Sequence, residues 1–93
     1  MAKYCKFTKE QVRKETYVKN GRPALLAYDK GQVLCHITVN LLNEEIADDE
    51  VFIKSYSENE GVIKDVVDMG IVAFPSRTVC TGYVTVYVCK LLI

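Results

Sequence analysis

The chain contains one histidine, His36, and four cysteines, and these side chains have the chemistry that catalysis near neutral pH most often uses. His36 falls on the polar side of an alternating segment, with Thr38 as its neighbour on the same side. No serine or cysteine has a spacing from His36 that is typical of an activated nucleophile. Cys80 precedes Thr81-Gly82, and we expect it to be the most exposed cysteine. A surface histidine and an ordinary thiol are therefore favoured, and an enzyme that uses His36 or Cys80 is the third functional hypothesis.

The spacing of the remaining ligand-type residues does not indicate a metal or a cofactor. The cysteines form no Cys-x-x-Cys pair, which zinc sites commonly contain; they are Cys5, Cys35, Cys80 and Cys89. The acidic segment from Asn43 to Glu50 lacks the alternating ligands and the central glycine of an EF-hand loop. No apolar h-region of a signal peptide is evident, so we expect a cytoplasmic protein with reduced thiols and no bound metal or cofactor.

Positive charge is concentrated in the N-terminal third of the chain. Residues 1–36 contain eight Lys or Arg and three Asp or Glu, whereas residues 37–68 contain two Lys or Arg and nine Asp or Glu. The whole chain is nevertheless neutral. Neutrality is not typical of a general polyanion binder, and the RRM and KH motifs are absent. Nucleic-acid binding through this third is the second hypothesis, and its candidate contacts are Lys6, Lys9, Arg13, Lys14, Lys19 and Arg22. The simpler interpretation is two solvated surfaces, and the alternative is a dipolar surface that attracts a protein partner.

Three local signals predict one helix over residues 58–69. Ser57 and Glu60 have the spacing of a capping box at its start, and Gly70 stands where a left-handed residue ends a helix. Between them is an apolar stripe with helical spacing, which consists of Val62, Ile63, Val66 and Val67. Valine has a weak helix propensity, so we expect this helix to be stable only because it packs on a sheet.

Two hairpins are predicted in the first half of the chain. Asn20-Gly21 is a strong hairpin signal, and Pro23 restricts the first strand to brief pairing or to an edge. The turn at 29–32 predicts a second hairpin between segments 24–28 and 33–41. Its expected cross-strand pairs put six side chains on one face; these are Tyr28 with Val33, Leu26 with Cys35, and Ala24 with Ile37.

Further strands are expected at 51–56, 77–80 and 83–91. The segment 83–91 is apolar on both sides, which is typical of an interior strand with both faces covered. We expect the helix to cover one face and a short N-terminal helix of two turns, which begins with a Thr8/Gln11 capping box, to shield the other. The apolar end at 91–93 is expected to be docked. Together these elements predict one α+β domain over residues 1–93, with a mainly antiparallel sheet of four to five strands and one capped helix on one face.

Several segments resemble one protein family over nearly the whole chain. They are the run from Val51 to Gly61, Arg77-Thr78-Val79, the segment from Tyr83 to Leu92 and the turn Asn20-Gly21-Arg22-Pro23-Ala24. The chain resembles small uncharacterised proteins encoded on conjugative and phage-like elements of gut Firmicutes. The resemblance implies a cytoplasmic accessory role in a mobile element and identifies no catalytic residue.

The first functional hypothesis is therefore a non-enzymatic accessory factor that binds another protein. We expect a monomer or a weak homodimer. No run approaches the roughly 20 apolar residues that cross a bilayer, so we expect no membrane partner.

Overall fold

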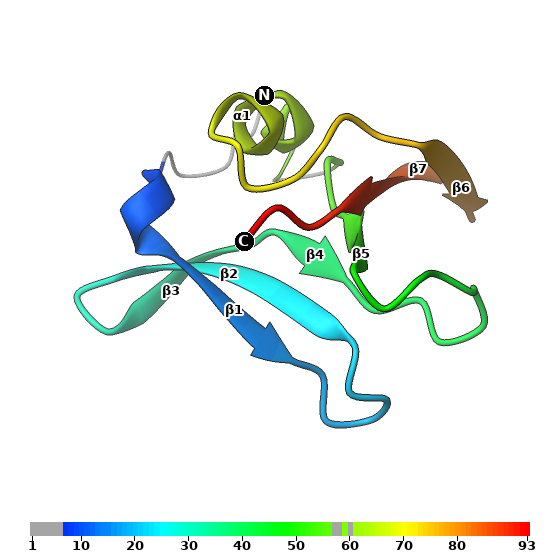
Figure 1. Cartoon of the computed structure of the whole chain (residues 1–93), viewed down its shortest axis with the longest axis horizontal. Helices are drawn as coiled ribbons and strands as arrows, with labels where there is room; N and C mark the ends of the chain where they lie inside the picture. The colour runs from blue at the N-terminus through cyan, green and yellow to red at the C-terminus, as the bar shows by residue number, and fades with distance from the viewer. Residues whose placement is uncertain (1–6, 57–58, 60) are drawn as a thin grey trace.

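The computed structural model describes residues 7–56, 59 and 61–93, and these residues form an α+β arrangement of two antiparallel sheets and one α-helix (Figure 1). Strands β1, β2 and β3 form the first sheet in that order, and the second sheet has the order β4-β5-β7-β6. The strands are β1 (Val12–Thr16), β2 (Pro23–Asp29), β3 (Gln32–His36), β4 (Thr38–Val39), β5 (Glu50–Ile53), β6 (Arg77–Thr81) and β7 (Val84–Lys90). The helices are η1 (Lys9–Gln11), a 3-10 turn, and α1 (Val62–Asp68). The α+β class is confirmed, but the strands are divided between two sheets instead of forming one sheet of four or five.

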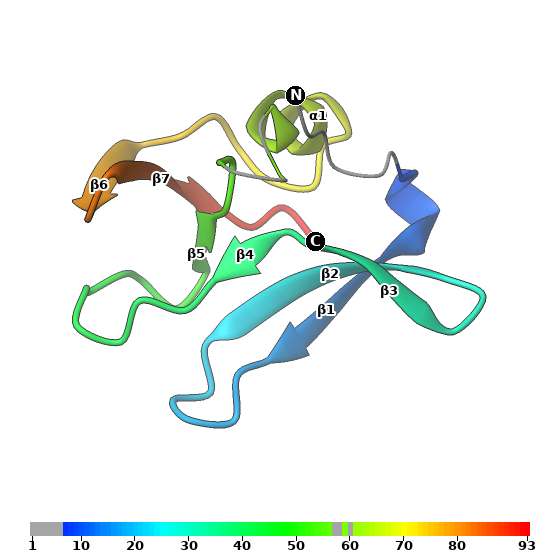
Figure 2. The ribbon, with the colours of Figure 1, turned by 180° about the vertical axis from the view of Figure 1, so that it is seen from behind.

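The chain passes from the first sheet to the second at a buried residue, Ile37. Its N–H donates to the Leu25 carbonyl of β2 at 3.0 Å, and its own carbonyl accepts from the Lys54 N–H just after β5 at 2.8 Å. Strands β3 and β4 are thus two halves of one bent strand that leaves the first sheet and enters the second (Figures 1 and 2). The long alternating segment 33–41 is explained by this bend, because each half has its own partner strand.

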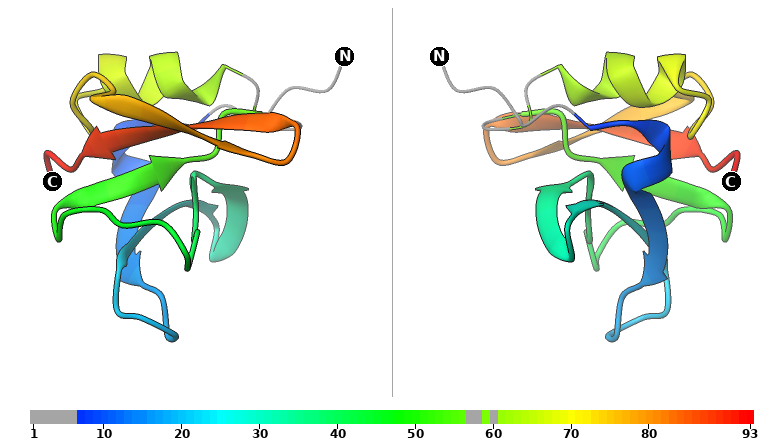
Figure 3. Two further views of the ribbon diagram at one scale, coloured as in Figure 1. Left: turned by 90° about the vertical axis from the view of Figure 1, so that its right-hand side faces the viewer. Right: turned by 90° about the vertical axis from the view of Figure 1, so that its left-hand side faces the viewer.

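The four-stranded sheet has a hydrophobic cluster on each face. The first core lies between the two sheets and α1, and it includes Leu25, Ile37, Val51, Ile53, Val62, Val66 and Cys89. The second core lies on the opposite face and consists of Phe52, Val79, Val86 and Val88, with Leu41 and Ile46 packed against it. The prediction that 83–91 is an interior strand covered on both faces is confirmed for β7. The second face is covered by the connector between β4 and β5, and not by an N-terminal helix (Figure 3).

Helix α1 ends as predicted and is shorter than predicted. Gly70 has φ +75°, its N–H donates to the Val67 carbonyl at 3.0 Å, and the Ile71 N–H donates to the Val66 carbonyl at 3.1 Å. These two bonds are the Schellman pair, which satisfies carbonyls that a helix end leaves open. The helix begins after Gly61, whose φ is +92°. The predicted capping box at 57 and 60, and the predicted start at 58, lie outside the described residues.

The valine face of α1 docks as expected. Val62 and Val66 are fully buried in the first core, whereas Ile63 and Val67 are half-buried at its margin. Burying two valines contributes on the order of 3–6 kcal/mol before conformational entropy is subtracted. The half-buried pair faces a groove that is described below.

The prediction of a two-turn helix near the N-terminus is wrong. Only one 3-10 turn forms at 9–11, and β1 starts at Val12. The Thr8 N–H donates to the Gln11 side-chain oxygen at 2.9 Å, so one half of the capping box does form. The helix stops there because Val12 pairs with Ala27 in the sheet and packs into the first core. Tertiary packing therefore overrides the local start signal.

The first hairpin forms with β1 as the edge strand, as predicted. Its loop is longer than a two-residue turn, because the Tyr17 N–H donates to the Arg22 carbonyl at 2.8 Å and closes the four residues 18–21. Gly21 adopts φ +72° inside this loop. Pro23 is the last residue of the ladder, opposite Thr16, where its missing N–H does not interrupt the pairing.

The second hairpin keeps its predicted turn but not its full register. The pair Tyr28–Val33 is confirmed. A β-bulge between Ala27 and Tyr28 then places Ala27, instead of Leu26, opposite Cys35. The predicted pairing beyond the turn is therefore wrong, and the six side chains do not share one face, because one extra residue exchanges the two faces of a strand. The buried side chains of this hairpin are Ala24, Leu25, Ala27 and Cys35.

The end of the described chain is docked through its backbone. The Leu91 N–H donates to the Asp49 carbonyl at 2.6 Å, and the Leu92 N–H donates to the Ile71 carbonyl at 2.9 Å. The side chains of Leu92 and Ile93 remain exposed. The expectation of a docked end is thus confirmed for the main chain.

Candidate protein-binding surface

An apolar groove runs between α1 and the segment that leads from α1 to β6. It has a volume of about 270 Å³, and its lining residues are Ile63, Lys64, Val67, Asp68, Phe74, Pro75 and Tyr87. The floor is Tyr87 of β7, one wall is the outer side of α1, and the other wall is Phe74-Pro75. We call this feature the α1 groove.

Phe74 is the most unusual residue of the α1 groove, because 81% of its surface is exposed. Pro75 fixes the backbone beside it, and the main chain on both sides is tied down. The Ala73 N–H donates to the Lys90 carbonyl at 2.8 Å, and the Ser76 N–H donates to the Val88 carbonyl at 2.9 Å. The phenyl ring is therefore presented to solvent from a fixed backbone, which lowers the entropy lost when a partner covers it.

The rim of the α1 groove is electrically neutral. Lys64 and Asp68 are one helical turn apart, with the Lys64 Nζ 3.3 Å from an Asp68 carboxylate oxygen. Both side chains are mostly exposed, so the pair contributes little to stability. An apolar hollow with a rim of paired charge suits an uncharged side chain from a partner.

His36 and Cys80 each line a shallow depression, and the two are separate. The depression at His36, about 250 Å³, also contains Glu15 and Tyr17, while that at Cys80, about 390 Å³, contains Glu44. The Tyr17 hydroxyl is hydrogen-bonded to the Thr38 hydroxyl at 2.8 Å, and burial raises the pKa of Tyr17. No hydrogen bond recorded among the described residues joins the His36 imidazole to a nucleophile. Cys80 is exposed, as predicted.

The buried thiols are parts of the core. Burial, with a smaller contribution from the negative charge of Glu50, raises the pKa of Cys89 to about 12, so this thiol stays protonated. The Cys35 thiol donates to the Asn59 side-chain oxygen at 3.6 Å, and the Asn59 amide donates to the His36 carbonyl at 2.6 Å. Asn59 thus connects the segment before α1 to the end of β3. No disulfide joins the cysteines of the described residues.

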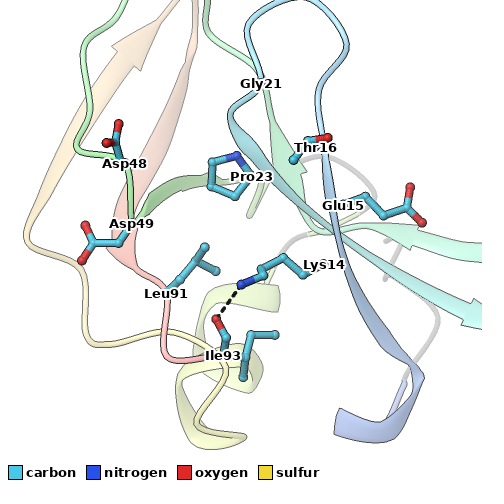
Figure 4. Close-up of a pocket in the computed structure, with 9 residues that line it drawn as sticks. All are labelled: Lys14, Glu15, Thr16, Gly21, Pro23, Asp48, Asp49, Leu91 and Ile93. Atoms are coloured by element: carbon cyan, nitrogen blue, oxygen red, sulfur yellow. Dashed lines mark hydrogen bonds between the residues drawn. The ribbon is translucent and has the colours of Figure 1, made fainter.

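Three of the basic residues proposed for nucleic acid donate to main-chain carbonyls of this chain. Arg22 donates to Leu41 and Glu44 at 2.9 and 2.7 Å, which holds the connector over the second core. Arg13 donates to Glu10 at 2.9 Å. Lys14 donates to Ile93 at 3.1 Å (Figure 4). Lys9 and Lys19 are exposed, and Lys6 lies outside the described residues. Nucleic-acid binding stays a prediction.

A larger polar cleft separates the β1–β2 hairpin from the connector and the end of the chain (Figure 4). Its volume is about 510 Å³, and it is lined by Lys14 on one side and by Asp48 and Asp49 on the other. Asp49 is also 3.7 Å from the Lys90 ammonium. Charged groups in this cleft thus contact the docked end of the chain. Within the described ranges, no three His, Cys, Asp or Glu side chains come close enough to hold a metal ion.

Comparison with known proteins gives no assignment, because no family model, curated protein or solved structure matches the chain. The described part of the chain also contains no helix that is long and apolar enough to cross a membrane. The functional inference therefore depends on the geometry of this molecule.

Sequence reasoning missed the α1 groove. The valine stripe predicted that Ile63 and Val67 would be buried with Val62 and Val66, and the structure leaves them half-buried. The sequence did contain one further signal, the Phe74-Pro75 pair between the predicted helix and the strand expected at 77–80. A large aromatic residue in a loop next to a proline is a reasonable candidate for a contact with a partner.

Proposed function

We propose that this protein is a small non-enzymatic protein-binding factor, and that its partner inserts an uncharged, apolar side chain into the α1 groove. The observation that supports this function is the combination of an 81% exposed Phe74 with a hollow of about 270 Å³ beside it. Aromatic side chains are enriched at the centres of protein interfaces, where they contribute much of the affinity. The resemblance to proteins of mobile elements supports a cytoplasmic accessory role as part of the same proposal.

A defined peptide library tests the proposal without a known partner. Peptides displayed on phage are selected against the whole chain, and those selected are synthesised and titrated by fluorescence anisotropy. We expect selected peptides to share an apolar anchor residue. The Phe74→Asp variant should weaken their binding by roughly tenfold or more, because a hot-spot residue contributes about 2 kcal/mol or more and a tenfold change corresponds to about 1.4 kcal/mol.

A matched control separates this effect from a general loss of surface apolarity. Val18 is fully exposed in the loop of the first hairpin, so Val18→Asp makes the same kind of change far from the α1 groove along the chain. Binding should be unchanged in this control. Equal weakening by both variants, or selected peptides that bind Phe74→Asp as well as the original chain, would show that the α1 groove is not the binding site.

A further inference from the structure

The sheet edges of this protein are not equally protected against pairing with another chain. Exposed edge strands are templates for pairing, and charged residues or bulges usually protect them. The β1 edge has the consecutive charges Arg13, Lys14 and Glu15, all exposed. On β3, the bulge at Leu34 distorts the ladder, and Asn59 donates to the His36 carbonyl at the end of the strand.

Strand β6 has neither kind of protection. It is the last strand of the β4-β5-β7-β6 sheet, and among the described residues no strand pairs with its outer side. Its sequence, Arg77 to Thr81, has one charge, and the Arg77 guanidinium is directed to the Glu45 carbonyl at 2.5 Å. The other four residues are Thr78, Val79, Cys80 and Thr81, which are uncharged and compatible with a strand.

We propose that β6 is the interface of a homodimer, in which two copies of β6 pair antiparallel about a twofold axis at Val79. In this register Arg77 of one copy lies opposite Thr81 of the other, so the two arginines are kept apart. Thr78 of each copy lies opposite Cys80 of the other copy. Val79 belongs to the second core, and the axis would place the two Val79 side chains next to each other on that face.

The same register gives a contact to Tyr83, which is fully exposed and lies in the turn directly after β6. Antiparallel pairing brings the beginning of one β6 to the end of the other, so Pro75 lies level with Tyr83 of the second copy. Packing of these two rings at both ends of the paired strands would then add to the main-chain hydrogen bonds. A twofold interface of this kind is self-complementary and closes at two copies.

The most apolar strand, β7, cannot pair with a second copy, because it is already paired on both sides, with β5 and with β6. The edge belongs to β6, which the sequence indicated only as a short segment.

A charge test addresses the register directly. The double variant Thr78→Lys/Cys80→Lys places like charges opposite each other in two symmetry-related pairs, and Thr78→Lys/Cys80→Glu places unlike charges there. Both positions are exposed, so both variants should fold, which circular dichroism verifies. Sedimentation equilibrium should give twice the 10.5 kDa chain mass for the original protein and for the Lys/Glu variant. The Lys/Lys variant should dimerise roughly tenfold or more weakly than the Lys/Glu variant.

A disulfide test examines whether the twofold axis lies at Val79. In a Cys5→Ser background, Thr78→Cys should give a disulfide-linked dimer on mild oxidation, because opposed residues have Cα atoms about 4.5–5.5 Å apart. Without Thr78→Cys, the two Cys80 Cα atoms would be about 8 Å apart, which is too far for a disulfide. A Val18→Cys control in the same background should not cross-link efficiently.

Two results would overturn the dimer. One is a chain that stays monomeric in sedimentation up to millimolar concentration, and the other is a dimer that both charge variants retain equally. Peptide binding by the Lys/Lys variant tests the proposed function independently of the dimer. The α1 groove should bind its peptides in that variant, whether or not the dimer exists.

Discussion

Replacement of Arg22 by lysine tests whether this residue holds the connector or contacts a ligand. Its two terminal nitrogens donate to the carbonyls of Leu41 and Glu44, and its guanidinium carbon lies 5.9 Å from the centroid of the Phe52 ring. A lysine keeps the positive charge but is a point charge without the planar fork, so we expect it to satisfy one carbonyl at most.

The magnitude follows from the contacts that are lost. A hydrogen bond to a charged group contributes about 1.5–3 kcal/mol, and lysine retains part of this. We expect Arg22→Lys to reduce the free energy of unfolding by about 1–2 kcal/mol, and Arg22→Ala to reduce it by about 2–4 kcal/mol. For a domain of this size, the lysine variant should therefore have a Tm that is lower by roughly 5–15 °C.

Urea denaturation followed by circular dichroism measures these changes. Arg13→Lys is the matched control, because the Arg13 bond to the Glu10 carbonyl is exposed and its loss should change stability by less than about 0.5 kcal/mol. An Arg22→Lys variant as stable as the original chain would refute the inference that this side chain fastens the connector. Arg22 would then again be a candidate for binding phosphate.

Two further predictions concern the first core. Val66 is fully buried on α1, so Val66→Ala should reduce the free energy of unfolding by about 2–3 kcal/mol in urea titrations. Val66→Asp should abolish cooperative unfolding. An unchanged Tm in either variant would mean that α1 does not dock through this residue. The pKa of Cys89 is raised to about 12 in the folded chain, above the roughly 8.5 of an unfolded thiol, so its contribution to stability is complete below about pH 8.5 and is lost as the pH rises toward 12. Denaturation near pH 7 and near pH 10 should therefore show a smaller alkaline loss for Cys89→Ala than for the original chain, and equal losses would contradict a buried, protonated thiol.

Some features of this fold are determined by short-range chemistry, and the sequence predicted these. The end of α1 needs only a glycine with positive φ and two backbone bonds, and all of these involve residues 66 to 71. The interior position of β7 follows from apolar residues on both of its faces. Such signals depend on residues that are close in sequence, so they can be recognised without knowledge of the tertiary structure.

Other features depend on residues far apart in sequence, and the sequence analysis missed them. Alternation gives the two faces of a strand but does not locate an inserted residue, so the bulge at Leu34, opposite Ala27 and Tyr28, was not predicted. The helix start at Thr8 was overridden because Val12 pairs with Ala27. The divided sheet follows from the bend at Ile37, whose two hydrogen bonds reach residues before and after it in the chain.

The candidate site was difficult to predict for the same reason. Whether Phe74 is buried, and whether β6 is an edge strand, depends on strand order and helix placement, which no local pattern contains. Basic and thiol side chains are the first candidates for binding or catalysis in this sequence, yet several of them stabilise the fold. Arg22 fastens the connector, Lys14 contacts the docked end of the chain, and Cys89 is a protonated core residue.

The division of roles between polar and apolar side chains leads to one expectation about function. In this chain many basic side chains hold loops on the sheets, so their removal should first change stability. Three surface features have no such intramolecular role and carry little net charge: the α1 groove, Phe74 and the edge of β6. Contacts of this type depend on apolar burial and main-chain pairing, and salt screens neither of these strongly. Binding and dimerisation should therefore persist at salt concentrations that would dissociate a nucleic-acid complex, for which affinity falls steeply with salt.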